Sequence, residues 1–109
     1  MNKRVHPRFY FDKPISGRLF INEIKGKVSD NKYTPIEIIN ISSGGLCFKS
    51  ILNFPNTRDY LLQIRFSEEV LRGNIVWRHN KHSYYLYGFK IESSSIGYLQ
   101  LFNVLKKAK

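Results

Sequence analysis

Apolar and polar side chains alternate along most of the chain with a period of two, which is typical of half-buried β-strands. The alternation is clearest where polar residues separate Leu62, Ile64 and Phe66. Together with turns rich in Gly, Asn and Ser, the pattern predicts six strands, over residues 14–21, 35–42, 46–50, 62–66, 70–78 and 84–92. Six short strands at close spacing favour an all-β fold, an antiparallel barrel or sandwich.

The period changes after the three serines at 93–95. From there apolar residues recur at every third position, at Ile96, Leu99, Phe102 and Leu105. Lysines follow at the end, and the serines are natural N-cap residues. The pattern therefore predicts a C-terminal helix over residues 94–107, laid across a barrel opening or a sheet face.

The start of the chain has a different character, because it is basic and contains no acid before Asp12. Pro7 disfavours a helix and pushes the residue before it toward an extended conformation. We expect residues 1–13 to form a flexible arm in front of a barrel over residues 14–92. Arm, barrel and helix would make a single domain spanning residues 1–109.

Composition narrows the class of protein. With 42% hydrophobic and 15% aromatic residues, the 109-residue chain can bury one ordinary core, which excludes disorder as the main state. No apolar run approaches the roughly 20 residues that span a bilayer. The single cysteine, Cys47, has no disulfide partner within the chain. We therefore expect a cytoplasmic protein that does not insert into membranes.

Charge indicates the kind of partner. Eighteen Lys and Arg stand against eight Asp and Glu, giving a formal net charge of +10. Such an excess favours anionic partners, which include nucleic acid, nucleotides and acidic membrane surfaces.

Two motifs carry candidate chemistry, Arg4-x-x-x-Arg8 in the arm and Asn40-x-Ser42-x-x-Gly45 between two predicted strands. Each alone is weak, because basic termini are commonly solvated and Asn, Ser and Gly commonly form turns. Arginine nevertheless suits both phosphate and guanine, since its planar fork pairs bidentately with either. In an extended arm the two arginines would stand roughly 13 Å apart, enough to reach different parts of one ligand.

The two motifs in this order and spacing resemble the signature of the PilZ domain family. Two later segments also resemble the family, Gly-Asn-Ile-Val-Trp at 73–77 and Gly-Phe-Lys-Ile at 88–91. The resemblance runs from Lys3 to about Glu92, with the helix after it. It implies an all-β fold with a C-terminal helix, namely a six-stranded antiparallel split barrel. It also implies a receptor for cyclic di-GMP rather than an enzyme.

Carried over by position, the resemblance implies that Arg4 and Arg8 grip guanine and phosphate. Asn40 and Ser42 would hydrogen-bond a guanine edge. At position 40 the family often has Asp, and Asn keeps an acceptor oxygen without the charge. We therefore expect binding to be retained, at equal or lower affinity.

Four further residues complete the candidate site. Gly45, together with Gly44, would let the backbone approach a base that a side chain would block. Lys3 stands where some members have another Arg, which leaves open whether one or two ligands bind. Trp77 either stacks on a base or packs in the barrel.

Other chemistry finds little support. His79-x-x-His82 has no Cys or carboxylate nearby to complete a zinc site, and no acid–His pair accompanies Ser42, so we expect no metal, no cofactor and no catalysis. With no output domain in the chain, the signal would pass by contact to a downstream effector protein.

Two alternative functions stay open. One is a small barrel that binds RNA or single-stranded DNA through its charge and its tyrosines, a less favoured partner. The other is a PilZ-like adaptor that binds protein and no nucleotide.

Overall fold

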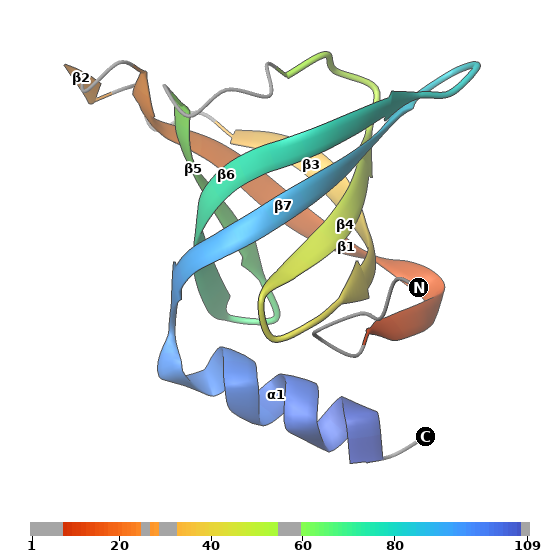
Figure 1. The fold of residues 1–109 in the computed structure, drawn as a ribbon, viewed down its shortest axis with the longest axis vertical. Coiled ribbons are helices and arrows are strands. Elements are labelled where there is room, and N and C mark those ends of the chain that lie inside the picture. The colour runs from red at the N-terminus through yellow and green to blue at the C-terminus, as the bar shows by residue number, and fades with distance from the viewer. Residues whose placement is uncertain (1–7, 25–26, 29–32, 55–59, 108–109) are drawn as a thin grey trace, which may run out of the picture.

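A computed structural model describes residues 8–24, 27–28, 33–54 and 60–107. Seven strands and one helix follow one another along these ranges (Figure 1). They are β1 (Phe9–Ile24), β2 (Lys27–Val28), β3 (Tyr33–Ile41), β4 (Gly45–Ser50), β5 (Tyr60–Phe66), β6 (Glu69–Asn80), β7 (Tyr85–Ser94) and α1 (Ile96–Lys107).

The strands form one antiparallel sheet in the order β2-β1-β3-β4-β7-β6-β5. An additional pairing of β1 with β5 joins the two sides of the sheet and closes it into a barrel. The two-residue β2 pairs only with the end of β1, so six long strands make the barrel. The prediction of a six-stranded antiparallel barrel with a C-terminal helix is confirmed. Among the described strands, closure pairs both edges of the sheet with each other.

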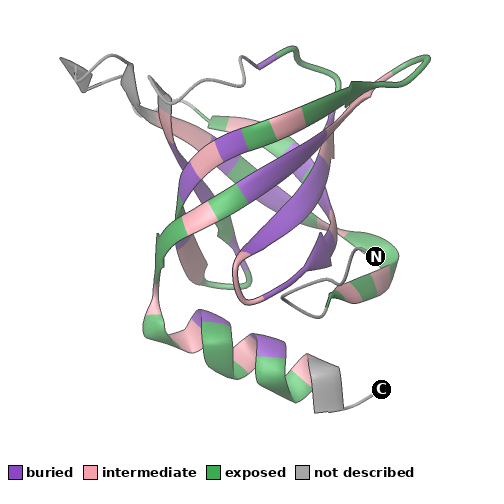
Figure 2. Cartoon of the chain, in the orientation of Figure 1, coloured by how far each residue is buried: buried purple, intermediate pink, exposed green. Residues whose placement is uncertain are grey.

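Buried residues recur along these strands and form one hydrophobic core (Figure 2). Within it the rings of Phe48 and Tyr87 stack with their centroids 4.9 Å apart. The Tyr87 hydroxyl donates a 2.6 Å hydrogen bond to the Leu52 carbonyl and accepts one of 2.7 Å from the Phe54 amide. The buried hydroxyl is thereby satisfied, and it holds the segment after β4 against the barrel.

The first strand begins earlier than the charge pattern predicted. Phe9 pairs with Ile41, and the register then shifts before pairing resumes at Ile15. This bulge contains Pro14, which has no N–H to offer to a sheet ladder. The rings of Phe9 and Phe11 meet edge to face with centroids 5.2 Å apart, and both pack against the core. Residues 9–13, expected in the arm, therefore belong to β1, and residues 1–7 lie outside the described ranges.

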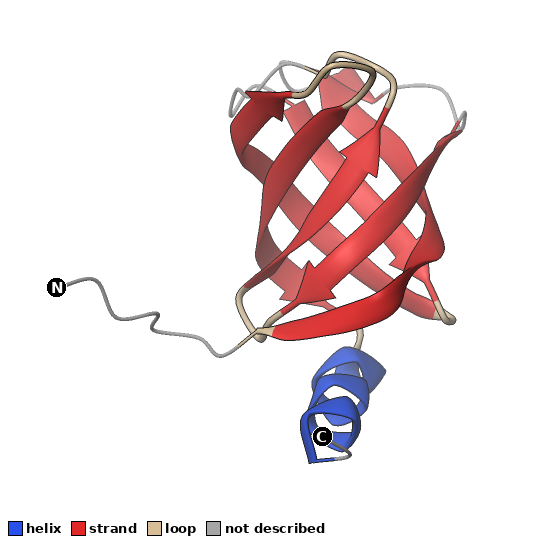
Figure 3. Cartoon of the chain, turned by 90° about the vertical axis from the view of Figure 1, so that its right-hand side faces the viewer, coloured by secondary structure: helices blue, strands red, loops and turns tan. Residues whose placement is uncertain are grey.

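Helix α1 lies across one end of the barrel, as predicted (Figures 1 and 3). Two of the four residues in the apolar repeat are not buried, however, because Ile96 and Leu99 are 86% and 48% exposed. Phe102 of the repeat is buried together with Tyr98, and Leu101 and Leu105 are partly buried beside them. Three residues turn an α-helix by only about 300°, so a strict three-residue repeat drifts away from any one face. None of the described helices has the length and apolar character needed to cross a membrane.

The start of α1 is fixed by β6 rather than by a serine cap. The Ser95 hydroxyl donates a 2.6 Å hydrogen bond to the Glu69 carboxylate and accepts one of 3.0 Å from the Val70 amide. A Cβ atom on Gly97 would lie 2.6 Å from the same carboxylate. A negative charge at this end of the helix stabilises the helix dipole. The barrel therefore sets where α1 begins.

Candidate functional site

One cavity, of about 260 Å³, is lined by five of the candidate site residues that were singled out from the sequence. They are Arg8, Ser42, Gly44, Gly45 and Trp77. Arg8 comes directly before β1, the serine and glycines form the turn between β3 and β4, and Trp77 lies on β6. Lys3 and Arg4 lie outside the described residues. We call this cavity the Arg8 pocket.

Asn40 does not line the Arg8 pocket but holds the arginine that does. Pairing of Tyr10 with Asn40 brings the start of β1 alongside the end of β3. There an Nη atom of Arg8 donates a 2.7 Å hydrogen bond to Oδ1 of Asn40. The carboxamide is buried while the arginine is exposed, and a guanidinium has five N–H donors. The bond therefore orients Arg8 and leaves most of its donors for another acceptor.

The Ser42 hydroxyl is occupied within its own turn. It donates to the Gly45 carbonyl and accepts from the Gly45 amide, at 3.1 Å each, while the Ser42 amide donates to the same carbonyl at 2.8 Å. The residue is only 2% exposed. Sequence reasoning expected this hydroxyl to face a guanine edge, whereas in the structure it closes the turn.

Gly45 is required by the neighbouring strand β7. It pairs with Lys90, and a Cβ atom at position 45 would lie 2.3 Å from the Phe89 carbonyl oxygen. Gly44 contributes a second tie, because its carbonyl accepts a 2.9 Å hydrogen bond from the Ile91 amide. The glycines thus bring the turn close to β7, a reason different from the expected approach of a base.

Trp77 forms a wall of the Arg8 pocket rather than part of the buried core. The register shifts between Ile75 and Trp77, and Trp77 pairs with Gly88. A Cβ atom on Gly88 would lie 2.0 Å from the indole nitrogen, so only glycine leaves room for the ring there. The indole is half-buried and meets the edge of the His79 ring. Gly88 therefore seats a flat aromatic surface beside the turn.

Lys90 was missed by sequence reasoning as a site residue. It is exposed, lines the Arg8 pocket, and adds a second cation to Arg8. Its signal was present, because it belongs to the segment 88–91 that resembles the family. No carboxylate stands among the described residues that line the pocket. The pocket therefore favours an anionic ligand.

Tyr98 connects the turn to α1. Its fully buried hydroxyl donates a 2.5 Å hydrogen bond to the Ser42 carbonyl. Burial raises the pKa of Tyr98, while this hydrogen bond and the Arg8 charge act in the opposite direction. Burial likewise raises the pKa of the Cys47 thiol, while the nearby Arg8 charge acts to lower it. The Tyr98 hydroxyl thus ties α1 to the turn that lines the Arg8 pocket.

The two histidines singled out in the sequence, His79 and His82, lie in the β6–β7 hairpin. His79 and His82 are exposed, and the described residues contain no cluster of three or more His, Cys, Asp or Glu able to hold a metal ion.

Comparison with known proteins identifies the class. The profile of the PilZ domain matches residues 2–103, and the chain therefore belongs to the PilZ domain family. PilZ domains are typically cyclic di-GMP receptors and generally have no catalytic activity. Among curated proteins the search finds no significant sequence match.

A solved structure shares the fold. The inhibitor of motility MotI/DgrA of Bacillus subtilis superposes with a TM-score of 0.69 at 15% sequence identity. The match covers 99% of this chain and 52% of that protein, so the chain spans about half its length.

Proposed function

We propose that this chain is a cyclic di-GMP receptor that binds its ligand in the Arg8 pocket. The observation that carries the proposal is the convergence of Arg8 with the turn at 42–45 and with Trp77 around one cavity. These are the positions at which the sequence matches the family's two motifs and its later strand. Membership of a family of cyclic di-GMP receptors supports the same ligand.

The ligand's chemistry matches the pocket's charge and shape. Cyclic di-GMP carries two phosphates and two guanines, and Arg8 can pair bidentately with phosphate or with guanine O6 and N7. Lys90 supplies a second cation for phosphate, and the flat indole of Trp77 supplies a stacking surface for a base.

The remaining site residues act through position. Asn40 holds the Arg8 guanidinium, and Ser42 closes the turn. Gly44 and Gly45 bring that turn close to β7.

In this proposal Arg4 and Lys3, in the arm, complete the contacts to the second guanine and phosphate. Each charge-assisted hydrogen bond contributes about 1.5–3 kcal/mol, so a few of them supply much of the roughly 8 kcal/mol of micromolar affinity. Ordering the arm opposes binding. Binding then folds the arm against the barrel and changes the surface offered to a downstream effector protein.

The three tyrosines at 84, 85 and 87 give little support to the alternative of a nucleic-acid-binding barrel. Single-stranded nucleic acid needs exposed aromatic faces for successive bases. Tyr87 is fully buried and its ring stacks on Phe48. Tyr84 and Tyr85 are half-buried.

Calorimetric titration tests the proposal, with cyclic di-GMP compared with GTP, cyclic GMP and single-stranded DNA. We expect saturable binding of cyclic di-GMP alone. Arg8→Ala should weaken it by about ten- to a hundredfold, the equivalent of about 1.4–2.8 kcal/mol. Lys81→Ala, which removes an exposed cation in the β6–β7 hairpin, is the matched control and should bind like the wild type. Unchanged affinity in Arg8→Ala, or tighter and steeply salt-dependent binding of DNA, would contradict the proposal.

A further inference from the structure

Two arginines lie directly opposite each other on the outside of the barrel. Arg18 on β1 pairs in register with Arg65 on β5, and both side chains are exposed. Like charges directly opposite on neighbouring strands destabilise a sheet. Their placement at the seam that closes the barrel therefore indicates a role other than stability.

Aromatic rings hold both guanidinium groups in place. The Arg65 guanidinium lies 4.7 Å from the Phe20 ring centroid, and Nε of Arg65 donates a 2.5 Å hydrogen bond to Gln63. The Arg18 guanidinium lies 5.7 Å from the Tyr33 ring centroid. Neither arginine forms a salt bridge with any described residue. Guanidinium groups oriented in this way lose little further freedom when they bind a carboxylate.

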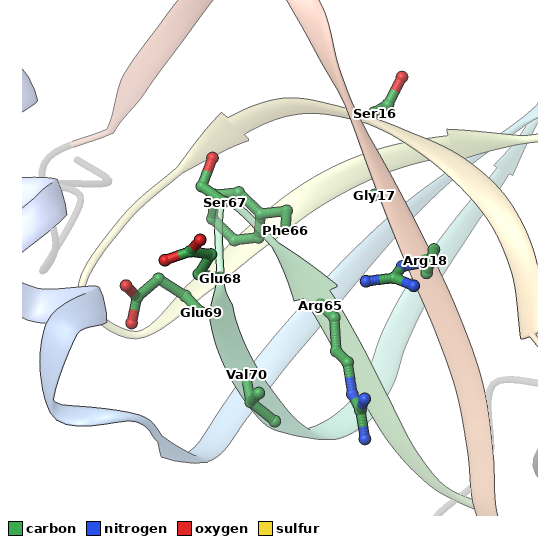
Figure 4. A pocket seen from close by; sticks show the side chains of 9 residues that line it. All are labelled: Ser16, Gly17, Arg18, Arg65, Phe66, Ser67, Glu68, Glu69 and Val70. Atoms are coloured by element: carbon green, nitrogen blue, oxygen red, sulfur yellow. The ribbon is translucent and has the colours of Figure 1, made fainter.

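A cavity of about 440 Å³ opens beside the two arginines. Figure 4 shows their side chains on one side of it, with Glu68 of the β5–β6 turn and Glu69 at the start of β6 on the other. Glu69 is already engaged by Ser95 at the start of α1. Anionic groups are therefore favoured only on the side formed by β1 and β5. The lining shares no residue with the Arg8 pocket.

We propose that this Arg18–Arg65 surface binds carboxylate side chains of an acidic segment of a partner protein. Carboxylates match the planar fork of arginine and neutralise the opposed charges. Nucleic acid fits less well, because guanidinium groups already cover ring faces of Phe20 and Tyr33 that bases would need.

The surface is tested by fluorescence anisotropy with a labelled short peptide of alternating glutamate and serine, and with oligo(dT) of similar length. We expect the wild-type protein to bind the peptide, and Arg18→Gln/Arg65→Gln to weaken that binding by about tenfold or more. Lys13→Gln/Lys81→Gln removes two exposed positive charges elsewhere and should leave peptide affinity nearly unchanged. Comparing the two variants separates this surface from the effect of total charge.

Three results would overturn the inference. They are no peptide binding by the wild type, equal weakening in both double variants, and tighter binding of oligo(dT) that depends on the same two arginines. Thermal melting guards against misfolding: the melting temperature of Arg18→Gln/Arg65→Gln should stay close to that of the wild type, because relief of the like-charge repulsion offsets the lost ring contacts of the two arginines. A melting temperature lowered by several degrees would be a fourth result against the inference. Both assays are run without cyclic di-GMP, so failure here leaves the proposed receptor function untouched.

Discussion

The guanidinium of Arg8 donates a 2.7 Å hydrogen bond to the carboxamide oxygen of Asn40, which lies 32 positions further along the chain. This bond joins the end of the first arginine motif to the start of the second motif. Because the acceptor is buried and the donor exposed, the barrel fixes the direction of the arginine before any ligand arrives.

Substitution of Asn40 tests this orienting role. Asn40→Ala removes the acceptor and keeps the Arg8 side chain. We therefore expect the affinity for cyclic di-GMP to fall by up to about tenfold. Asn40→Asp keeps an acceptor and adds a charge, and should bind at least as tightly as the wild type. Calorimetry measures both. If Asn40→Ala bound normally, or if Asn40→Asp bound as weakly as Asn40→Ala, the orienting role would be wrong.

The turn should tolerate no side chain at position 45. In Gly45→Ala the new methyl group would meet the Phe89 carbonyl oxygen at 2.3 Å, so β4 and β7 must separate. We expect a loss of about 1–3 kcal/mol in the free energy of unfolding. Gly17→Ala is the control, because its nearest neighbour is a flexible side-chain methyl group of Ile38 at 3.0 Å, which can yield. Urea denaturation compares the two, and an equal or larger loss in Gly17→Ala would contradict the steric account.

The helix should depend on the hydroxyl of Tyr98. Tyr98→Phe removes the 2.5 Å hydrogen bond to the Ser42 carbonyl and leaves that buried acceptor without this donor. We expect a loss of about 1–3 kcal/mol in the free energy of unfolding. Tyr33→Phe, at an exposed position, should change it little. Equal stability of the two variants would show that the hydroxyl does not hold α1 to the turn.

Stability should fall at alkaline pH. Burial raises the pKa of Tyr98, and that of Tyr87 in the same direction, above the ordinary value of about 10. Below about pH 10 both forms of the protein keep these protons, so the two groups give no pH dependence. Above it the unfolded chain loses them first, and the free energy of unfolding decreases as pH rises. Urea denaturation across this range should show a shallower decline in Tyr98→Phe, and an unchanged slope would contradict the assignment to Tyr98.

Sequence periodicity sufficed for the barrel because alternation survives wherever one strand face is buried, as at Leu62, Ile64 and Phe66. Periodicity was less informative toward the two ends of the chain. Phe9 and Phe11 already alternate, yet the surrounding positive charge and Pro7 outweighed that signal. In α1 the burial of Tyr98 depends on what the helix packs against, which no local repeat encodes.

The site was predictable in its members more than in their roles. Arg8, Ser42, Gly45 and Trp77 do meet around one cavity. Their roles depend on pairing between strands that are distant in sequence. Ser42 closes its own turn, and position 45 must be glycine because a Cβ atom there would collide with the Phe89 carbonyl oxygen. The same holds for Lys90, which enters the pocket because β7 pairs with β4.

The fluorescence of Trp77, the one tryptophan of the chain, reports on the Arg8 pocket most directly. Titration with cyclic di-GMP should give a saturable change in its emission, which GTP does not reproduce and which moves to about ten- to a hundredfold higher concentration in Arg8→Ala. An emission that stays constant while cyclic di-GMP is added, or an identical titration curve in Arg8→Ala, would contradict binding in this pocket.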